Sequence, residues 1–173
     1  MIILESKVQI PVLPQVFTPR SRLRETLESG MTRSRLVLVS APAGYGKTTL
    51  LADWAHASSL PVAWLTITGE EGDVEGFLRY LFAAWERAQP EVTKTSLGIH
   101  FESSSLDVKV ILSEFVNAAS RMPNHLIFVL DDFHLLTDQG VYEAVTFLLD
   151  HLPANPRPAC RMPPPGQRAR CDR

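Results

Sequence analysis

The ten residues Ser40 to Thr49, "SAPAGYGKTT", decide the fold of this 173-residue chain. From Ala41 they follow the P-loop pattern G-x-x-x-x-G-K-[ST], with alanine in place of the first glycine. The apolar run "RLVLVS" (35–40) precedes them, and a helical pattern follows from Thr48 to Ser58. In this order, loop amides and a helix N-terminus converge on one phosphate chain. The stretch therefore predicts a phosphate site between a buried parallel strand at 35–40 and a helix.

Each chemical part of such a loop is present. Gly44 and Gly46 let the backbone wrap closely around a ligand, Lys47 reaches the β and γ phosphates, and the Thr48 hydroxyl ligates Mg²⁺. The alternative is a glycine turn with an incidental lysine. The residues predicted to contact the nucleotide here are Ala41, Ala43, Gly44, Tyr45, Gly46, Lys47, Thr48 and Thr49.

A second motif, "LIFVLDD" at 126–132, is a buried strand that ends in two carboxylates. Such a strand places its last residue at the carboxyl edge of the sheet, where ligands collect. We predict that Asp131 holds the metal, and that Asp132 orients or deprotonates an attacking water. The alternatives are a helix cap for Asp131 and a solvated acid for Asp132. His134 is either a packed or hydrogen-bonded loop histidine or a nucleotide sensor.

The rest of the body alternates strands with helices. Pro61–Ile67 and His125–Leu130 are predicted strands, and Asp73 is a predicted helix cap. Helices are predicted from apolar residues at helical spacing over 74–85, 108–119 and 141–152. This alternation indicates βαβ units, hence an α/β fold with a parallel sheet and helices on both faces.

Composition excludes several other classes of protein. The chain has 17 Lys and Arg against 19 Asp and Glu, with no basic stripe of the kind that nucleic-acid binders carry. No apolar run approaches the roughly 20 residues of a membrane span, and Glu5 interrupts any signal peptide. We expect a cytoplasmic protein without a membrane partner. Cys160 and Cys171 are too few for a disulfide framework.

The composition changes abruptly at Pro153. Six of the 21 residues from Pro153 to Arg173 are proline and five are arginine. Such a segment lacks ladder donors and apolar area, so we expect it to be disordered. The predicted organisation is a lead-in segment (1–34), an ATP-binding core (35–152) and a tail (153–173).

Four stretches together resemble the N-terminal ATPase module of the large MalT-like LuxR-family transcriptional regulators, in the STAND class of P-loop NTPases. They are "LVLVSAPAGYGKTTLLADWA", "PVAWLTI" with "FLRYLFAAW", "LIFVLDDFHLL" and "VYEAVTFLLDHLP". The resemblance, from about Lys7 to Pro153, implies ATP and Mg²⁺ as ligands. "FTPRSRLRETL" (17–27) is similar to the family segment near the adenine, which makes Arg20 a nucleotide contact; the alternative is a surface arginine at a helix start.

The chain departs from the family after Leu152. The family continues with a strand ending in Thr-Arg, which lies between the P-loop strand and the Asp131 strand. Here the proline-rich and arginine-rich tail stands instead, as a truncated or frameshifted gene would give. We therefore expect a P-loop NTPase fold of the additional-strand type without its sensor strand, with unpaired backbone groups or with Asp131 crowded against Lys47. Low stability and little ATP hydrolysis would follow.

The resemblance implies a nucleotide switch rather than a fast enzyme. ATP and Mg²⁺ would favour an assembly-competent state of the intact regulator, with self-association, and slow hydrolysis would reset it. The helical repeats and DNA-binding module of the family have no counterpart here. Two alternatives stay open: a small-molecule phosphotransferase that uses the same P-loop, and a non-functional fragment.

Overall fold

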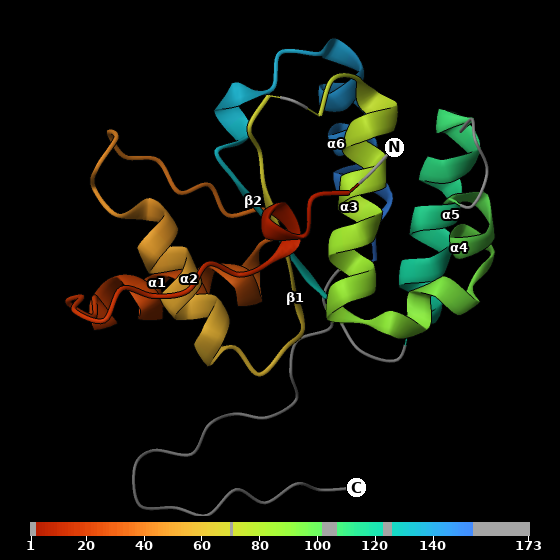
Figure 1. Ribbon diagram of the computed structural model, residues 1–173. Coiled ribbons are helices and arrows are strands. Elements are labelled where there is room, and N and C mark those ends of the chain that lie inside the picture. Colours follow the sequence, from red (N-terminus) through yellow and green to blue (C-terminus); the bar gives the residue numbers. More distant parts are fainter. Residues whose placement is uncertain (1–2, 70, 102–106, 123–125, 154–173) are drawn as a thin grey trace, which may run out of the picture.

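The fold is centred on a sheet of two parallel strands, β1 (Val62–Thr66) and β2 (Ile127–Asp131). The computed structural model describes residues 3–69, 71–101, 107–122 and 126–153 (Figure 1). Val62 lies opposite Ile127, and the register continues to Thr66 opposite Asp131. Both strands confirm the prediction from their apolar runs. Because the strands are parallel, their carboxyl ends meet at one edge of the sheet.

Helices cover both faces of this sheet, which confirms the α/β class (Figure 1). On one side lie α1 (Ser21–Arg33) and α2 (Lys47–Ala57). On the other lie α3 (Val74–Ala88), α4 (Ser96–Phe101), α5 (Val108–Arg121) and α6 (Gln139–His151). Short 3-10 turns occur at η1 (Glu5–Val8), η2 (Pro90–Lys94) and η3 (Phe133–Leu135).

Three of the helices begin at an aspartate whose side chain accepts hydrogen bonds from the first turn. Asp73 accepts from the Gly76 amide, as predicted, and Asp138 accepts from the Val141 amide. Asp107 accepts from two amides of α5. These caps satisfy donors that a helix start otherwise leaves unpaired. The predicted helices at 74–85, 108–119 and 141–152 are thus confirmed as α3, α5 and α6.

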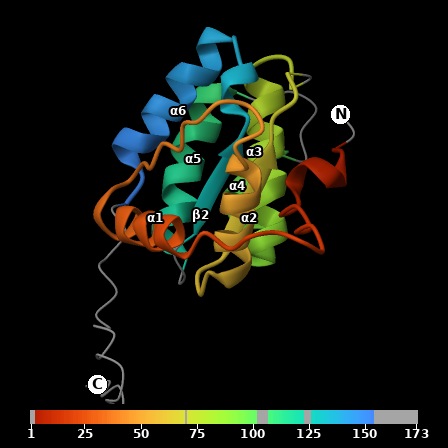
Figure 2. The same cartoon turned by 90° about the vertical axis from the view of Figure 1, so that its left-hand side faces the viewer.

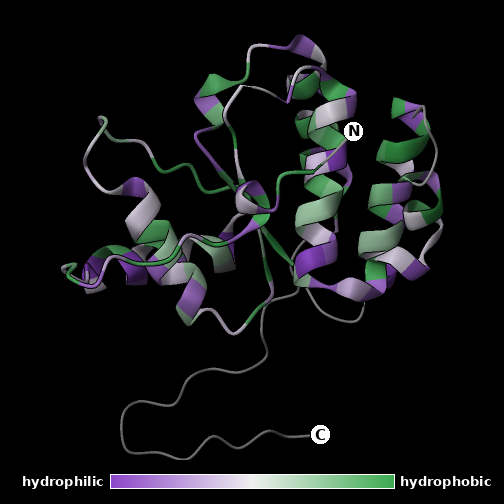
Figure 3. Cartoon of the chain, viewed as in Figure 1, coloured by the Kyte–Doolittle hydropathy of each residue, from purple (hydrophilic) through white to green (hydrophobic). Residues whose placement is uncertain are grey.

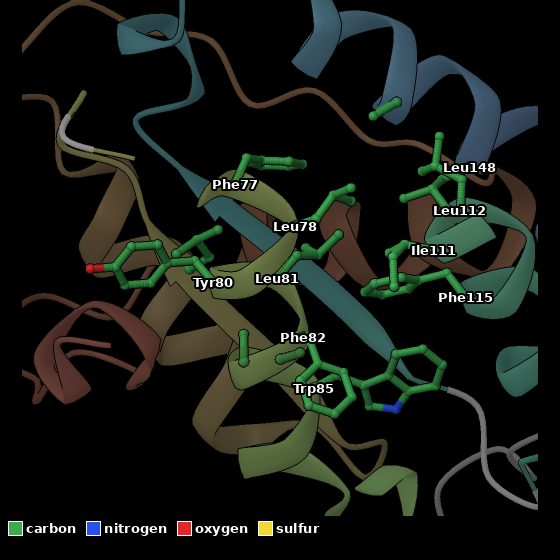
Figure 4. Packing of buried hydrophobic residues seen from close by; sticks show 14 of the residues in the cluster. Phe77, Leu78, Tyr80, Leu81, Phe82, Trp85, Ile111, Leu112, Phe115 and Leu148 are labelled. Atoms are coloured by element: carbon green, nitrogen blue, oxygen red, sulfur yellow. The ribbon is translucent and has the colours of Figure 1, made fainter. Parts of the chain in front are cut away.

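The apolar face of α3 makes the larger of two cores (Figure 4). Phe77, Leu78 and Trp85 are almost fully buried and face α5 and α6. The Trp85 ring lies 5.3 Å from the ring of Phe115 on α5. The second core lies on the opposite face, where Trp54 of α2 packs with Trp64, Ile127 and Val129. The sheet is therefore sandwiched between two apolar layers, the arrangement of an α/β domain.

The predicted strand at 35–40 is wrong. This segment is an irregular connection from α1 to α2, and within the described residues its backbone pairs with neither β1 nor β2 (Figure 2). Its middle residues, 36–39, are hydrophobic, and the segment is mostly green in Figure 3, yet Leu36 is 61% exposed and Leu38 is 84% exposed. A strand needs a partner edge as well as β-branched residues, and in the part of the chain that the structure describes no strand is paired with this segment.

A buried ion pair fastens the N-terminal segment to the loop after β1. Lys7 Nζ lies 3.0 Å from Glu71 Oε1, and the two side chains are 6% and 0% exposed. The ammonium also donates to Thr68 Oγ1 at 2.6 Å, and Glu71 accepts from the Gly69 amide at 2.8 Å. This network lies at the carboxyl end of β1.

None of the helices in the described part of the chain combines the length and apolar character of a membrane span.

Candidate functional site

The loop from Ala41 to Gly46 turns on two glycines with left-handed backbone. Gly44 has φ +80° and Gly46 has φ +75°, a region that residues with a Cβ rarely adopt. Helix α2 begins directly after Gly46, at Lys47. The first amides of α2 therefore face the loop, as a phosphate site at a helix N-terminus requires.

Lys47 reaches back over this loop. Its Nζ donates to the Ala41 carbonyl at 2.9 Å and, at 3.4 Å, to the Pro42 carbonyl. The ammonium is thus held at the mouth of the loop by neutral acceptors, which an anionic ligand can replace with a stronger charge-assisted bond. Lys47 is therefore bonded to the loop carbonyls, and the expected crowding of Asp131 against Lys47 is not observed.

Asp131 contacts Thr48 instead. The Thr48 hydroxyl donates to Asp131 Oδ2 at 2.8 Å, which joins the first turn of α2 to the end of β2 across 83 positions of sequence. Asp131 is 4% exposed. The Thr48 hydroxyl and the Asp131 carboxylate are hard oxygen donors that suit Mg²⁺, which takes few protein ligands and completes its shell with water and phosphate oxygens. Within the described residues no group of three or more His, Cys, Asp or Glu could hold a metal by itself.

Burial raises the pKa of the Asp131 carboxyl, and the neighbouring Asp132 charge adds to the rise. The Thr48 hydrogen bond and the charge of Lys47 act in the opposite direction but do not cancel it. Burial therefore disfavours the ionised form of Asp131, and a nearby cation would stabilise that form.

Asp132 adopts a left-handed backbone with φ 56°, the one described non-glycine residue with positive φ. Its side chain turns to solvent beside His134, whose Nδ1 lies 3.8 Å from Asp132 Oδ1. The His134 side chain is 71% exposed, so it is not a packed core histidine. Strained backbone of this kind clusters at functional sites.

Arg20 lies on the outer side of the loop. Its Nη1 donates to the Tyr45 carbonyl at 2.8 Å, and its guanidinium would lie 3.6 Å from a Cβ placed on Gly46. The structure thus brings Arg20 to the P-loop backbone, at the start of α1. Tyr45 itself is exposed and directs its carbonyl toward Arg20.

The other predicted residues line part of one cavity of about 1220 Å³, which extends along the whole of β2. These are Ala41, Ala43, Gly44, Gly46, Lys47, Thr48, Thr49, Asp131 and Asp132, together with His134. Tyr45 and Arg20 do not line it. Sequence reasoning missed the Lys7–Glu71 pair at the same end of the sheet; the acidic loop "TGEEGD" (68–73) was the signal that could have directed attention there.

This geometry agrees with the comparison to protein families. Residues 18–160 match the AAA ATPase domain family. The chain belongs to that family. Membership confirms the P-loop NTPase fold, and a nucleotide site is the property that an ATPase domain of this kind implies.

Similar curated proteins are called "HTH-type transcriptional regulator MalT". The protein of that name from Yersinia enterocolitica is 34% identical over 153 residues, and the one from Yersinia pestis is 33% identical over the same length. Each alignment covers 88% of this chain and 17% of the relative. The AAA ATPase domain described here thus spans about a sixth of the length of these relatives.

Replacement of Asp131 with asparagine should stabilise the fold at neutral pH by about 0.5–2 kcal/mol, as at other sites where function opposes stability. A carboxyl whose folded pKa is raised destabilises the fold above that pKa, and the penalty fades as the pH falls. Urea unfolding of Asp131→Asn and wild type at pH 7 and pH 4 checks this, with the exposed Glu25→Gln as control. A variant less stable than wild type at pH 7 would contradict the prediction.

Proposed function

We propose that this chain is an ATP-binding and Mg²⁺-binding regulatory switch module with slow hydrolysis at most. The hydrogen bond between Thr48 and Asp131 carries the proposal. Among the described residues, Asp131 is the only buried carboxylate at the end of a strand. The hydrogen bond holds it against the hydroxyl of Thr48, the residue that follows the P-loop lysine. A glycine turn with an incidental lysine would have no reason to hold these two oxygens together.

The residues of the chain have distinct parts in this proposal. Lys47 exchanges the Ala41 carbonyl for phosphate oxygens, while the amides after Gly46 hold the same phosphate chain. Thr48 and Asp131 would hold Mg²⁺, which neutralises phosphate charge when bound. Asp132 orients the attacking water from its exposed position. Arg20 holds the loop through the Tyr45 carbonyl, and we propose that it contacts the nucleotide from the outer side of the loop.

The switch role rests on the relatives, which are named as transcriptional regulators. We infer that the chain, in residues 35–152 with a lead-in at 1–34, supplies the nucleotide-dependent part of a MalT-like, LuxR-type regulator. ATP would shift such a module only if one conformation binds it better than the other. Self-association of the intact regulator would be the response.

Titration with a fluorescent ATP analogue in Mg²⁺ tests the site. We expect Lys47→Ala to weaken binding by about 10- to 100-fold, because a charge-assisted contact contributes about 1.5–3 kcal/mol. The exposed Lys109→Ala, at the start of α5, removes the same charge away from the site and serves as the control. Equal affinity of wild type and Lys47→Ala would refute the assignment.

Turnover separates the switch from a phosphotransferase. The wild-type chain is incubated with Mg-ATP and a panel of small hydroxyl acceptors, and phosphate release to water is compared with transfer. A switch module should give slow release to water and no preferred acceptor. Rapid transfer to one acceptor would overturn the proposal in favour of the phosphotransferase.

A further inference from the structure

Thr66 is the last residue of β1 and the register partner of Asp131, the last residue of β2. Neighbouring strands of a sheet lie about 4.8 Å apart, so the two residues are side by side at the carboxyl edge. The Ile67 amide donates to the Asp131 carbonyl at 3.0 Å, which extends the pairing one residue past β1. The ends of the two strands are therefore held level with each other.

The side chains of Thr66 and Asp131 also lie on the same face of the sheet. Residues two positions apart along a strand share a face. Thr66 thus shares the face of Trp64, and Asp131 shares that of Val129, and both apolar residues belong to the core on the α2 side. The hydrogen bond from Thr48 of α2 to Asp131 agrees with this placement. The Thr66 hydroxyl therefore borders the carboxylate of the proposed metal site.

The Thr66 hydroxyl has a proton that the fold does not use. The Trp64 indole Nε1 donates to Thr66 Oγ1 at 2.8 Å, so this oxygen already acts as an acceptor. In the part of the chain that the structure describes, the hydroxyl itself donates to no other atom. Trp64 is 1% exposed, so its position in the core fixes the side of the oxygen that it occupies. The Thr66 proton is left to point toward an acceptor elsewhere at the carboxyl edge.

Asp131 can accept such a proton. A carboxylate accepts about four hydrogen bonds, and among the described side chains only Thr48 donates to this one, at Oδ2. Asp131 is 4% exposed, so bulk water has little access to the remaining acceptor positions. No direct hydrogen bond joins Thr66 to Asp131 in the described residues. Polar groups separated by more than a hydrogen-bond length are commonly joined by one ordered water.

We propose that Thr66 is a positioning residue of the metal site, whose hydroxyl donates to a water that in turn donates to the Asp131 carboxylate. This inference rests on the Mg²⁺ site of the proposed function. Carboxylates that hold a metal are themselves oriented by hydrogen bonds, and loss of such an outer partner lowers metal affinity about 10- to 100-fold. Thr66 thus orients Asp131 toward Thr48, and Trp64 orients Thr66.

The Mg²⁺ dependence of nucleotide binding tests this inference. The affinity of the full chain for the fluorescent ATP analogue is measured in EDTA and along a Mg²⁺ titration. Thr66→Val keeps the branched shape but removes the hydroxyl, whereas Thr66→Ser keeps the hydroxyl. We expect Thr66→Val to raise the Mg²⁺ concentration at half-maximal effect at least about tenfold and to change the affinity in EDTA by less than about twofold. Thr66→Ser should restore most of the Mg²⁺ effect.

A second pair of variants keeps the test valid if Thr66→Val weakens the fold. That variant leaves the buried Trp64 indole without its acceptor, which is destabilising by itself. The double variant Trp64→Phe with Thr66→Val lacks both groups and is compared with Trp64→Phe alone, with thermal unfolding as the check on folding. The Mg²⁺ midpoint should differ within this pair as it does between Thr66→Val and wild type. Thr146→Val, exposed on α6, is the control and should leave the midpoint unchanged.

The outcomes separate this inference from the function on which it rests. A Mg²⁺-dependent gain in wild type with the same midpoint in Thr66→Val would overturn the role of Thr66 alone. An equal loss in Thr66→Val and Thr66→Ser, or an equal loss in EDTA and in Mg²⁺, would show that Thr66 only supports the fold. No gain from Mg²⁺ in wild type would overturn the proposed metal site together with this inference.

Discussion

Lys7→Met should destabilise the fold by about 3–5 kcal/mol, the cost of removing one partner of a buried ion pair. Glu71 would remain fully buried without its counter-cation, and Thr68 Oγ1 would lose its bond to the ammonium. The Lys7 stem also packs near Tyr80, with Nζ 5.1 Å from the ring centre, so methionine keeps much of the apolar contact. Urea unfolding followed by circular dichroism measures the loss.

Two further variants show whether the buried charge is the cause. Lys94→Met removes an exposed lysine and should change stability by no more than about 0.5 kcal/mol. The double variant Lys7→Met with Glu71→Gln should recover at least about 1 kcal/mol, since the amide oxygen still accepts from the Gly69 amide. A Lys7→Met variant within 1 kcal/mol of wild type would contradict the prediction.

The same pair predicts a pH dependence. Burial alone would raise the pKa of Glu71, but backbone hydrogen bonds and the bond from Lys7 lower it on balance below 4.5. In the wild type the ionised Glu71 carboxylate stabilises the fold above pH 4.5, and this stabilisation is lost as the pH falls through the folded pKa of Glu71. Without Lys7 the Glu71 pKa rises, so the stability gap between Lys7→Met and wild type should narrow on acidification. A gap that widens between pH 7 and pH 5 would contradict this.

Gly76→Ala should destabilise the fold by about 3 kcal/mol or more, at the upper end of the cost of overpacking. A Cβ at this position of α3 would lie 2.0 Å from the Glu71 carbonyl oxygen, so backbone must move. The clash outweighs the roughly 1 kcal/mol by which alanine favours a helix over glycine. Thermal unfolding measures the effect.

Gly140→Ala is the matched control, because it also lies in the first turn of a helix. There the nearest atom to an added Cβ is Asp138 Oδ1 at 3.0 Å, a side-chain atom that can shift. We expect a change within about 1 kcal/mol for this variant. Equal destabilisation by the two alanines would show that the contact with Glu71 is not the cause.

The sequence predicts those elements that carry their own pattern. α3, α5 and α6 each have one apolar face, and β1 and β2 are short apolar runs, so local periodicity was enough. α4, with six residues, is too short to show a period. Residues 35–40 carry a strand pattern, but strand formation depends on a partner edge that local sequence does not encode.

The candidate site likewise has one part that local sequence patterns predict and another part that they do not. The P-loop letters and the "LIFVLDD" motif predicted that Thr48 and Asp131 lie close together, and the structure places them 2.8 Å apart. The Lys7–Glu71 pair joins residues 64 positions apart, and both are of types that are almost never fully buried alone. No local pattern distinguishes such a pair from surface charges. The role of Asp132 and the place of Arg20 relative to a nucleotide remain predictions.

The contact between Thr48 and Asp131 has a consequence for synthesis of the chain. At about 5–20 residues per second on the ribosome, the 83 positions between them take roughly 4–17 seconds to translate. During that time α2 and Lys47 exist without the Asp131 carboxylate. β1 is also unpaired, because β2, its only described partner in the sheet, has not yet been made. The proposed nucleotide site can therefore assemble only after β2 has been made, so an ATP ligand that needs both Thr48 and Asp131 would not guide the folding steps that precede β2.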